Sequence, residues 1–196
     1  MGLQMMGKMY GANGMLPDAR KLGTAFLDDY YADIYDKLST VKAVITDVDG
    51  VLTDGCMYWA KDGLLFKRFH TRDVGAVFRL RDSGIKFFVI TSANDDITRR
   101  RIEMMHPDLS RYGVENKLAC TSVILDEWGI DLEDAVYIGD DNIDREIMQA
   151  VGVSIAPIDA LESIRCIADI ICPLEGGKGV LAWIADKMLN KDNNDD

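Results

Sequence analysis

The sequence predicts an α/β fold in which a parallel β-sheet is covered by helices on both faces. Short apolar runs rich in β-branched residues alternate with segments that carry apolar residues at helical spacing, a pattern typical of strand–helix–strand units. Polar residues follow the ends of three expected strands, which is the edge where open α/β sheets bind ligands. The 196 residues are enough for one such domain with a sizeable core.

The composition excludes several classes of protein. A formal net charge of −11 argues against nucleic acid or an anionic membrane surface as the main partner. The four cysteines include no C-x-x-C pair and only two histidines are present, so we expect free thiols in a reducing cytoplasm and no zinc site. No apolar run reaches the roughly 18 residues that span a membrane, and no secretory signal is evident. We therefore expect a cytoplasmic protein.

The chain is expected to have three parts. Residues 1–40 are predicted to form a leader and an amphipathic helix over 22–38, which either packs on the domain or binds a partner. Residues 41–189 are predicted to form the folded domain. Residues 190–196 are predicted to be a disordered tail.

The same patterns place the elements of the domain. The expected strands cover residues 41–45, 85–91, 112–114, 135–138, 153–156 and 170–172. The expected helices cover residues 73–81, 94–105, 116–128, 142–150, 160–167 and 179–189. Two strand-like runs at 56–60 and 64–70 flank a short connector with a glycine, which predicts a β-hairpin. The hairpin follows the first strand's loop directly and is placed to overhang it.

Two acidic residues end the first expected strand. The apolar run that begins at Val41 stops at Asp47 and Asp49, and Gly50 and Gly55 indicate that the chain bends into a loop there. Two like charges this close stay ionised only with compensation, which is usually a bound cation. The alternative interpretation is a solvated acidic turn.

Other boundaries between expected elements carry polar or glycine-rich sequences. Thr91-Ser92 and Asp140-Asp141 follow two later strands. Lys117 lies near a helix start, where a cation opposes the helix dipole, so it is either an exposed side chain or a functional cation. Gly-Gly-Lys-Gly precedes the last helix and either offers backbone N–H groups to an anion or is a flexible turn.

The sequence Asp-x-Asp-Gly-x-x-Thr-Asp-Gly at 47–55 resembles motif I of the haloacid dehalogenase superfamily phosphatases. The resemblance implies that Asp47 is the nucleophile that accepts the phosphoryl group and that Asp49 is the general acid/base. A carboxylate can attack phosphorus, and a second carboxyl can protonate the leaving oxygen and then activate water. By the same resemblance, Thr91 matches motif II, a hydroxyl that hydrogen-bonds the phosphoryl oxygens. Lys117 matches motif III, a cation that neutralises charge on the nucleophile and the phosphoryl group.

The sequence Gly-Asp-Asp-x-x-Asp after the fourth expected strand resembles motif IV of the same superfamily. The implied cofactor is Mg²⁺, which prefers oxygen ligands and usually binds one or two carboxylates together with phosphate. The implied ligands are the side chains of Asp47 and Asp140 and the backbone carbonyl of Asp49. Asp141 or Asp144 is expected to be a helix cap or to hold the ligand side chains in place.

Further motifs narrow the resemblance to one group within the superfamily. The chain carries Phe-x-x-Arg-Asp at 69–73, Asn-Lys-Leu at 116–118 and the terminal Gly-Gly-Lys-Gly, and it lacks the long insertions that form a cap domain. Over residues 41–187 it resembles the 3-deoxy-D-manno-octulosonate 8-phosphate phosphatases and the related phosphatases of nine-carbon sialic-type sugar acids. The resemblance implies a Rossmann-like three-layer haloacid dehalogenase fold with a β-hairpin flap and no cap domain.

The same resemblance implies an activity and an assembly. The expected activity is that of a phosphoric monoester hydrolase in lipopolysaccharide or sialic acid biosynthesis. Its expected substrate is 3-deoxy-D-manno-octulosonate 8-phosphate or a nine-carbon sialic-type 9-phosphate, hydrolysed through an aspartyl-phosphate intermediate. The expected assembly is a homotetramer in which a neighbouring subunit closes each active site.

Four residues are expected from the resemblance to bind the substrate: Thr91, Ser92, Arg72 and Lys178. Four positions depart from the family pattern. Ser92-Ala93 stands where Gly-Arg is common, Val74 where a Gly is usual, and Lys178 where an Arg is usual. An Arg binds a sugar carboxylate through two parallel hydrogen bonds, which neither Lys nor Ala can form. The reaction class is therefore defined more sharply than the sugar acid.

Two other classes of protein share part of this pattern. A phospho-receiver domain also has an acidic pair after its first strand, but its phospho-accepting Asp ends the third strand and a Lys follows the fifth. Neither feature is evident here. A catalytically idle assembly or regulatory module is expected to have lost the nucleophile or a metal ligand, and this sequence keeps both.

Overall fold

The computed structural model describes residues 37–189, of which 37–40 are helical. The predicted leader, nearly all of the helix predicted over 22–38 and the predicted tail lie outside the described residues. Among the helices of residues 37–189, none combines the length and the apolar character needed to cross a membrane.

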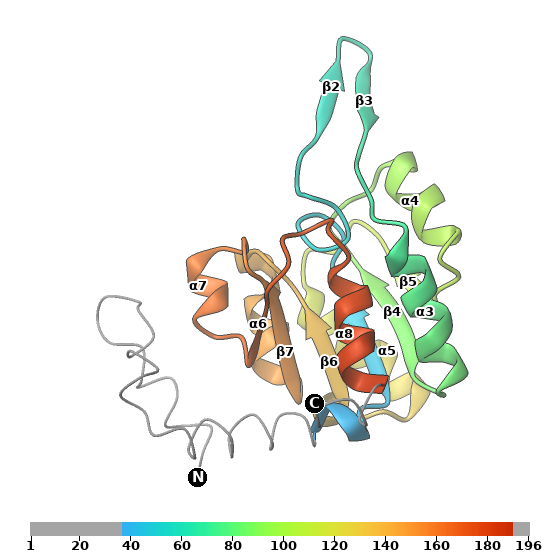
Figure 1. Ribbon diagram of the computed structural model, residues 1–196, viewed down its shortest axis with the longest axis vertical. Helices are drawn as coiled ribbons and strands as arrows, with labels where there is room; N and C mark the ends of the chain where they lie inside the picture. The colour runs from blue at the N-terminus through green and yellow to red at the C-terminus, as the bar shows by residue number, and fades with distance from the viewer. Residues whose placement is uncertain (1–36, 190–196) are drawn as a thin grey trace, which may run out of the picture.

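A six-stranded parallel sheet forms the middle layer, in the order β5-β4-β1-β6-β7-β8 (Figure 1). Its strands are β1 (Ala43–Thr46), β4 (Lys86–Ile90), β5 (Leu109–Arg111), β6 (Ala135–Ile138), β7 (Val153–Pro157) and β8 (Ile170–Cys172). All residues of β1 are buried, as expected for an inner strand that is covered on both faces. The predicted parallel α/β sheet is confirmed.

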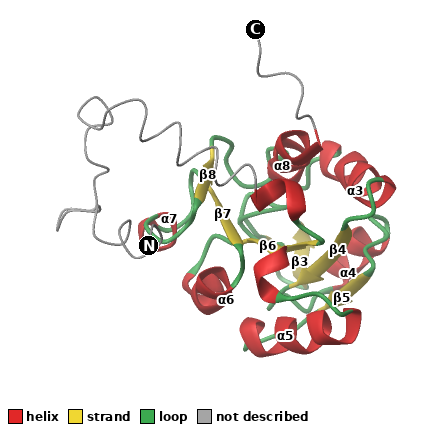
Figure 2. Ribbon diagram, turned by 90° about the horizontal axis from the view of Figure 1, so that it is seen from below, coloured by secondary structure: helices red, strands yellow, loops and turns green. Residues whose placement is uncertain are grey.

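Helices cover both faces of this sheet and complete three layers (Figure 2). They are α3 (Arg72–Asp82), α4 (Asp96–Glu103), α5 (Lys117–Trp128), α6 (Arg145–Ala150), α7 (Glu162–Arg165) and α8 (Val180–Leu189), with the 3₁₀ helices η1 (Leu132–Asp134) and η2 (Asn142–Asp144). Alternate side chains of β1 point to opposite faces. Val44 therefore joins the core beneath α3 and α8, whereas Ala43 and Ile45 join the core beneath α5 and α6.

An antiparallel hairpin projects beyond the carboxyl edge of the sheet (Figure 1). It consists of β2 (Tyr58–Ala60) and β3 (Gly63–Phe66). The rings of Tyr58 and Phe66 stack with centroids 4.2 Å apart. A bridge between Thr53 and Phe69 joins the base of the hairpin to the loop after β1. The predicted flap is confirmed, and residues 37–189 contain no cap domain.

Two details of the predicted elements are wrong. The strand predicted at 112–114 lies too late in the chain, because β5 ends before it and Gly113 turns the backbone with φ 67°. β5 is an edge strand and is only partly buried, so it lacks the apolar run that marks the inner strands. The helix predicted to begin at residue 94 begins at Asp96, and its N-cap is Asp95 although the neighbouring Asn94 is also a suitable cap residue. Both side chains suit a cap, and only the backbone geometry distinguishes them.

Candidate active site

The loop after β1 carries Asp47, the expected nucleophile. Asp47 follows β1 directly and is only 5% exposed, and its Oδ1 accepts a hydrogen bond of 2.7 Å from the backbone N–H of Val48.

The pairing of β1 with β6 brings the loop that carries Asp140 to the same edge of the sheet. Gly50 permits the close approach of the two loops, because a Cβ there would lie 1.9 Å from Asp140 Oδ2 and its φ is 82°.

Asp49, the expected general acid/base, is held from both sides. Its Oδ1 accepts a hydrogen bond of 3.0 Å from the Thr53 hydroxyl, and its Oδ2 accepts one of 2.7 Å from Lys67 Nζ. The Thr53 hydroxyl oxygen also accepts from the backbone N–H groups of Gly50 and Gly55. The buried Thr53 thus connects the backbone of the loop to the Asp49 carboxylate and holds that carboxylate in place.

Lys117 is the first residue of α5, and its side chain is fully buried. Its Nζ lies 2.7 Å from Asp47 Oδ2 and 2.6 Å from Asp144 Oδ1. Burial alone would lower the pKa of Lys117, but the attraction of the two carboxylates outweighs it and raises that pKa, so the ammonium stays charged. Burial raises the pKa of Asp47 to about 6, with Lys117 opposing the shift and Asp144 adding to it. The interpretation of Lys117 as an exposed side chain is therefore excluded.

Asp144 accepts hydrogen bonds both from Lys117 and from the loop that carries Asp140. Its Oδ1 accepts from Lys117 Nζ at 2.6 Å and from the Tyr137 hydroxyl at 2.7 Å. Its Oδ2 accepts from the backbone N–H groups of Asp140 and Asp141 at 3.0 and 3.1 Å. Asp141 is the N-cap of η2. Asp141 therefore acts as a helix cap, and Asp144 holds Lys117 and the backbone of Asp140 in place.

The acidic residues at this edge fit a magnesium ion. Asp47, Asp140 and Asp144 each place a carboxylate oxygen within 4.8 Å of the others. Both oxygens of Asp144 already accept two hydrogen bonds each, whereas Asp140 Oδ1 is buried with no hydrogen-bond partner among the described residues. Burial, followed by repulsion from Asp47, Asp144 and Asp141, raises the pKa of Asp140 to about 8. A crowded, unpaired carboxylate suits a cation ligand, so Asp47 and Asp140 fit the ion better than Asp144 does.

The expected substrate-binding residues lie at different places around this centre. Thr91 follows β4 directly and is buried; its Oγ1 accepts from the backbone N–H of Ala93 at 3.1 Å and keeps its own hydrogen to donate. Ser92 is exposed on the same loop. Arg72 and Lys178 are also exposed, and their side chains take no part in the described hydrogen-bond network of the carboxylates. The structure therefore brings Thr91 to the buried end of β4 and leaves the other three on the surface.

The glycine-rich turn before α8 packs against the loop after β1. Gly177 donates its backbone N–H to the Val51 carbonyl at 2.9 Å, and Gly176 donates its own to Asp159 Oδ1 at 2.9 Å. A Cβ at Gly176 would lie 2.2 Å from the carbonyl oxygen of Gly50, so only a glycine allows the two backbones to touch. Because these two N–H groups are used inside the protein, the turn braces the loop and does not offer them to an anion.

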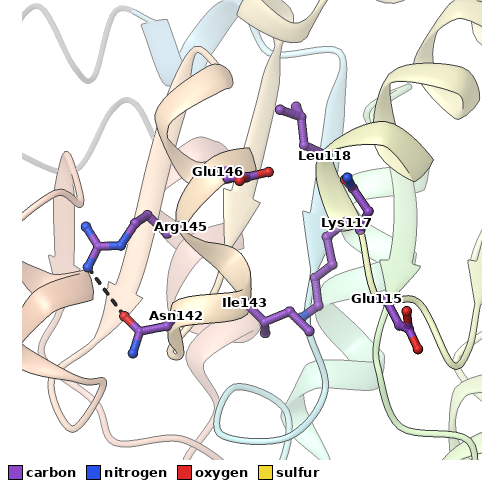
Figure 3. Close-up of a pocket in the computed structure, with 8 residues that line it drawn as sticks. Glu115, Lys117, Leu118, Asn142, Ile143, Arg145 and Glu146 are labelled. Atoms are coloured by element: carbon purple, nitrogen blue, oxygen red, sulfur yellow. Dashed lines mark hydrogen bonds between the residues drawn. The ribbon is translucent and has the colours of Figure 1, made fainter.

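A pocket of about 310 Å³ opens between the start of α5 and the segment of η2 and α6 (Figure 3). It is lined by Glu115, Asn116, Lys117, Leu118, Asn142, Ile143, Arg145 and Glu146. The stem of Lys117 runs along the pocket toward Ile143, and Arg145 turns toward Asn142. Because none of the carboxylates expected to act in catalysis lines it, this pocket is a neighbour of the candidate site.

Two residues that hydrogen-bond the carboxylates of the site, Lys67 and Tyr137, lie outside the motifs and were not predicted from the sequence. Lys67 precedes Arg68 at the end of a hairpin strand, where a pair of cations is typical of a solvated surface. The available signal was its position between apolar Phe66 and Phe69, which predicts partial burial. Tyr137 lies within a buried strand and is indistinguishable in sequence from an ordinary core residue.

Comparison with known proteins identifies the family. A family model described as haloacid dehalogenase-like hydrolase matches residues 89–184. The 3-deoxy-D-manno-octulosonate 8-phosphate phosphatase KdsC of Haemophilus influenzae is 36% identical over 154 residues, which cover 78% of this chain and 85% of that protein.

Two solved structures of such phosphatases share the fold. The cobalt-bound form of the Haemophilus influenzae enzyme matches with a TM-score of 0.76 at 35% identity, over 79% of this chain and 90% of that one. The Moraxella catarrhalis enzyme, in complex with a magnesium ion, a phosphate ion and a KDO molecule, matches with a TM-score of 0.77 at 28% identity. That match covers 81% of this chain and 91% of the other.

These likenesses agree with the site described above. The prediction of Mg²⁺ as the cofactor is confirmed, because a relative holds this ion and the described carboxylates fit it. Which residues hold the ion stays a prediction. The chain belongs to the 3-deoxy-D-manno-octulosonate 8-phosphate phosphatase family of haloacid dehalogenase-like hydrolases, and it is a phosphoric monoester hydrolase.

Proposed function

We propose that this enzyme hydrolyses 3-deoxy-D-manno-octulosonate 8-phosphate through an aspartyl-phosphate intermediate. The observation that carries the proposal is the contact of 2.7 Å between Asp47 Oδ2 and Lys117 Nζ, beside the unpaired carboxylate of Asp140. A buried carboxylate with a fixed cation stands at the sheet edge where α/β proteins bind ligands. The names of the relatives support this choice of substrate.

The two carboxylates of the loop after β1 divide the chemistry between them. The Asp47 carboxylate attacks phosphorus, the bond from phosphorus to the sugar oxygen breaks, and Asp49 gives that oxygen a proton. Asp49, now a carboxylate, then takes a proton from water, whose oxygen attacks the phosphorus of the aspartyl phosphate. The bond from phosphorus to Asp47 breaks, which restores the carboxylate and releases inorganic phosphate.

The remaining residues of the site stabilise charge. The Lys117 ammonium offsets the negative charge that develops on Asp47 and the phosphoryl group, and the Thr91 hydroxyl donates to a phosphoryl oxygen. Asp47, Asp140 and the backbone carbonyl of Asp49 are proposed to hold Mg²⁺. When bound, the ion neutralises phosphoryl charge and orients the group for in-line attack.

The sugar acid is proposed to be recognised by residues other than the catalytic carboxylates. Arg72, Ser92 and Lys178 are proposed to contact it, and their exposure suits contact with a ligand that enters from solvent. A nine-carbon sialic-type 9-phosphate is the second candidate. It is favoured by the absence of an Arg after Thr91 and by Lys178, because a Lys binds a carboxylate as a point charge and not through two parallel hydrogen bonds.

A panel of phosphorylated keto-sugar acids with eight and nine carbons tests the proposal. With Mg²⁺ present, we expect the eight-carbon 8-phosphate to give the highest kcat/KM, by about tenfold or more, because sites that read hydroxyl groups discriminate strongly. Release of inorganic phosphate is the measurement. EDTA should abolish turnover and added Mg²⁺ should restore it. Preference for a nine-carbon substrate would transfer the assignment to that sugar, and full turnover in EDTA would contradict the metal.

We also propose that the enzyme is a homotetramer in which the hairpin of one subunit covers the active site of a neighbour. Three large apolar residues of the hairpin are more than half exposed: Trp59 at 68%, Leu65 at 59% and Phe66 at 51%. The hairpin stands away from its own domain (Figure 1). Exposed apolar surfaces of this kind mark interfaces, and closed symmetry buries the same surface once in every subunit.

Replacing two of these side chains should dissociate the assembly. Trp59→Asp combined with Phe66→Asp places two charges in the proposed interface, so we expect monomers by light scattering together with a fall in kcat/KM. Val123→Asp is the matched control, because Val123 is 59% exposed on α5, outside the hairpin. A wild-type monomer at micromolar concentration would refute the tetramer. Dissociation with full activity would show that the neighbour does not complete the site.

Residues 41–189 are proposed to form the phosphatase domain. The proposed partners are the phosphorylated sugar acid and other copies of this chain; the net charge of −11 disfavours nucleic acid and anionic membranes. We propose the cytoplasm as its location, since the cysteines of the described residues are unpaired.

A further inference from the structure

Lys67 is a buried cation at the base of the hairpin, and the mechanism above does not use it. It follows β3 directly, and only 1% of its side chain is exposed. Its Nζ lies 2.7 Å from Asp49 Oδ2, 2.8 Å from Asp95 Oδ2 and 2.9 Å from Thr98 Oγ1. An ammonium group has three N–H donors and no acceptor. All three donors therefore have partners.

The surroundings of Lys67 keep it charged. Burial alone would lower its pKa, but hydrogen bonds and attraction from Asp49 and Asp95 more than offset this and raise the pKa. An apolar side chain would fill the same space without the loss of hydration that a buried ammonium suffers. The ammonium is therefore explained by the groups that it holds, and one of them is the expected general acid/base.

We infer that Lys67 is a positioning residue that fixes the Asp49 carboxylate for proton transfer by tying it to the base of the hairpin. This inference rests on the function proposed above. Because the ammonium only donates, Asp49 Oδ2 must accept from it, and Oδ1 is the oxygen that exchanges a proton with the substrate. The Thr53 hydroxyl donates its single hydrogen to Oδ1, and its oxygen already accepts from the backbone N–H groups of Gly50 and Gly55, so Thr53 does not take up the proton that Oδ1 carries to the substrate.

A purely structural role for Lys67 would be to attach the hairpin to α4. The start of α4, however, is already capped without it. Asp95 Oδ1 accepts from the backbone N–H of Thr98 at 2.9 Å, and Asp95 Oδ2 accepts from the Thr98 hydroxyl at 2.9 Å. The contact that connects Lys67 to the chemistry is therefore the one with Asp49, and this contact can be tested separately.

The test compares good and poor leaving groups in Lys67→Met. p-Nitrophenolate leaves without a proton, whereas the poorer leaving group of phenyl phosphate depends on the general acid. We expect kcat/KM of the variant to fall about 10- to 100-fold further with phenyl phosphate than with p-nitrophenyl phosphate. This difference is smaller than the effect of removing the general acid altogether, because Asp49 is still present. Asp95→Asn leaves the contact between Lys67 and Asp49 in place and should keep the wild-type ratio, as should the exposed control Lys187→Met.

A double-mutant cycle decides whether Lys67 acts through Asp49. Asp49→Asn should show an equal or larger change in the ratio, and adding Lys67→Met to it should change the ratio no further. A further change would overturn the inference. Because Lys67→Met alone leaves two carboxylates near each other, Lys67→Met with Asp95→Asn is the second variant if the first does not fold. We expect the same altered ratio from it.

The possible failures are distinguishable. Equal losses with both esters in Lys67→Met, or in its double variant with Asp95→Asn, would overturn the inference and leave Lys67 as a structural anchor. A wild-type protein that hydrolyses neither ester in the presence of Mg²⁺ would overturn the proposed function, and the inference with it.

Discussion

Asp47→Asn is expected to remove phosphatase activity, with a fall in kcat of about 10⁴-fold or more. An amide does not form the acyl phosphate, so the covalent intermediate is lost, although the side chain keeps its size. Asn has one acceptor oxygen, whereas the two oxygens of Asp47 now bond Val48 N–H and Lys117 Nζ. One of these contacts is lost in the variant, which costs about 1–3 kcal/mol of folding free energy. The domain should therefore fold and remain inactive.

Phosphate release in the presence of Mg²⁺ and thermal unfolding followed by circular dichroism measure the two effects of Asp47→Asn. Asp126→Asn is the matched control, because Asp126 is an exposed residue of α5, and it should behave like the wild type. Substantial turnover by Asp47→Asn would remove Asp47 from the role of nucleophile. Loss of activity with loss of the folded state would instead make the residue structural.

Lys117→Met is expected to lower kcat by about 10²- to 10³-fold. Methionine fills similar space without a charge, so the phosphoryl group and Asp47 lose the cation that offsets their charge. Asp47 and Asp144 would then face each other without their shared partner. Breaking a buried pair in this way costs about 3–5 kcal/mol of folding free energy, so the unfolding midpoint should fall as well.

A second substitution separates the two effects of Lys117→Met. Adding Asp144→Asn removes one of the uncompensated charges, so stability should recover in part while kcat stays low. The assay is phosphate release at a temperature where each variant is folded by circular dichroism, with Lys187→Met as the exposed control. A single variant with wild-type kcat would show that the buried ammonium holds the fold together and takes no part in the reaction.

The parts of the fold and site that could be predicted are those with a local signal. β1 is an apolar run that is followed at once by Asp47 and Asp49, and Asp140 follows the buried strand β6 after a single glycine. Parallel strands place their carboxyl ends together, so the meeting of Asp47 and Asp140 followed from topology. β5 lacked such a signal, because Ser110 and Arg111 sit at a half-exposed sheet edge.

The parts that could not be predicted depend on contacts between distant segments. Lys67 is an ordinary hairpin charge until β3 returns toward Asp49 and α4, and no property of its neighbours in sequence reveals both carboxylates. Tyr137 has the pattern of a core residue, and only the position of Asp144 gives its hydroxyl a partner. Gly176 is a common turn residue until the carbonyl of Gly50 is placed against it.

The brace formed by Gly176 and Gly177 has a consequence for the order of events during protein synthesis. The chain leaves the ribosome from its N-terminus, so β1 and its acidic loop emerge long before this turn exists. Gly177 donates to the carbonyl of Val51, inside that loop, so this hydrogen bond of the loop forms only after the turn has been made. A nascent chain thus carries its nucleophile almost from the start of the domain, but it becomes an enzyme only when nearly all of the domain has been made.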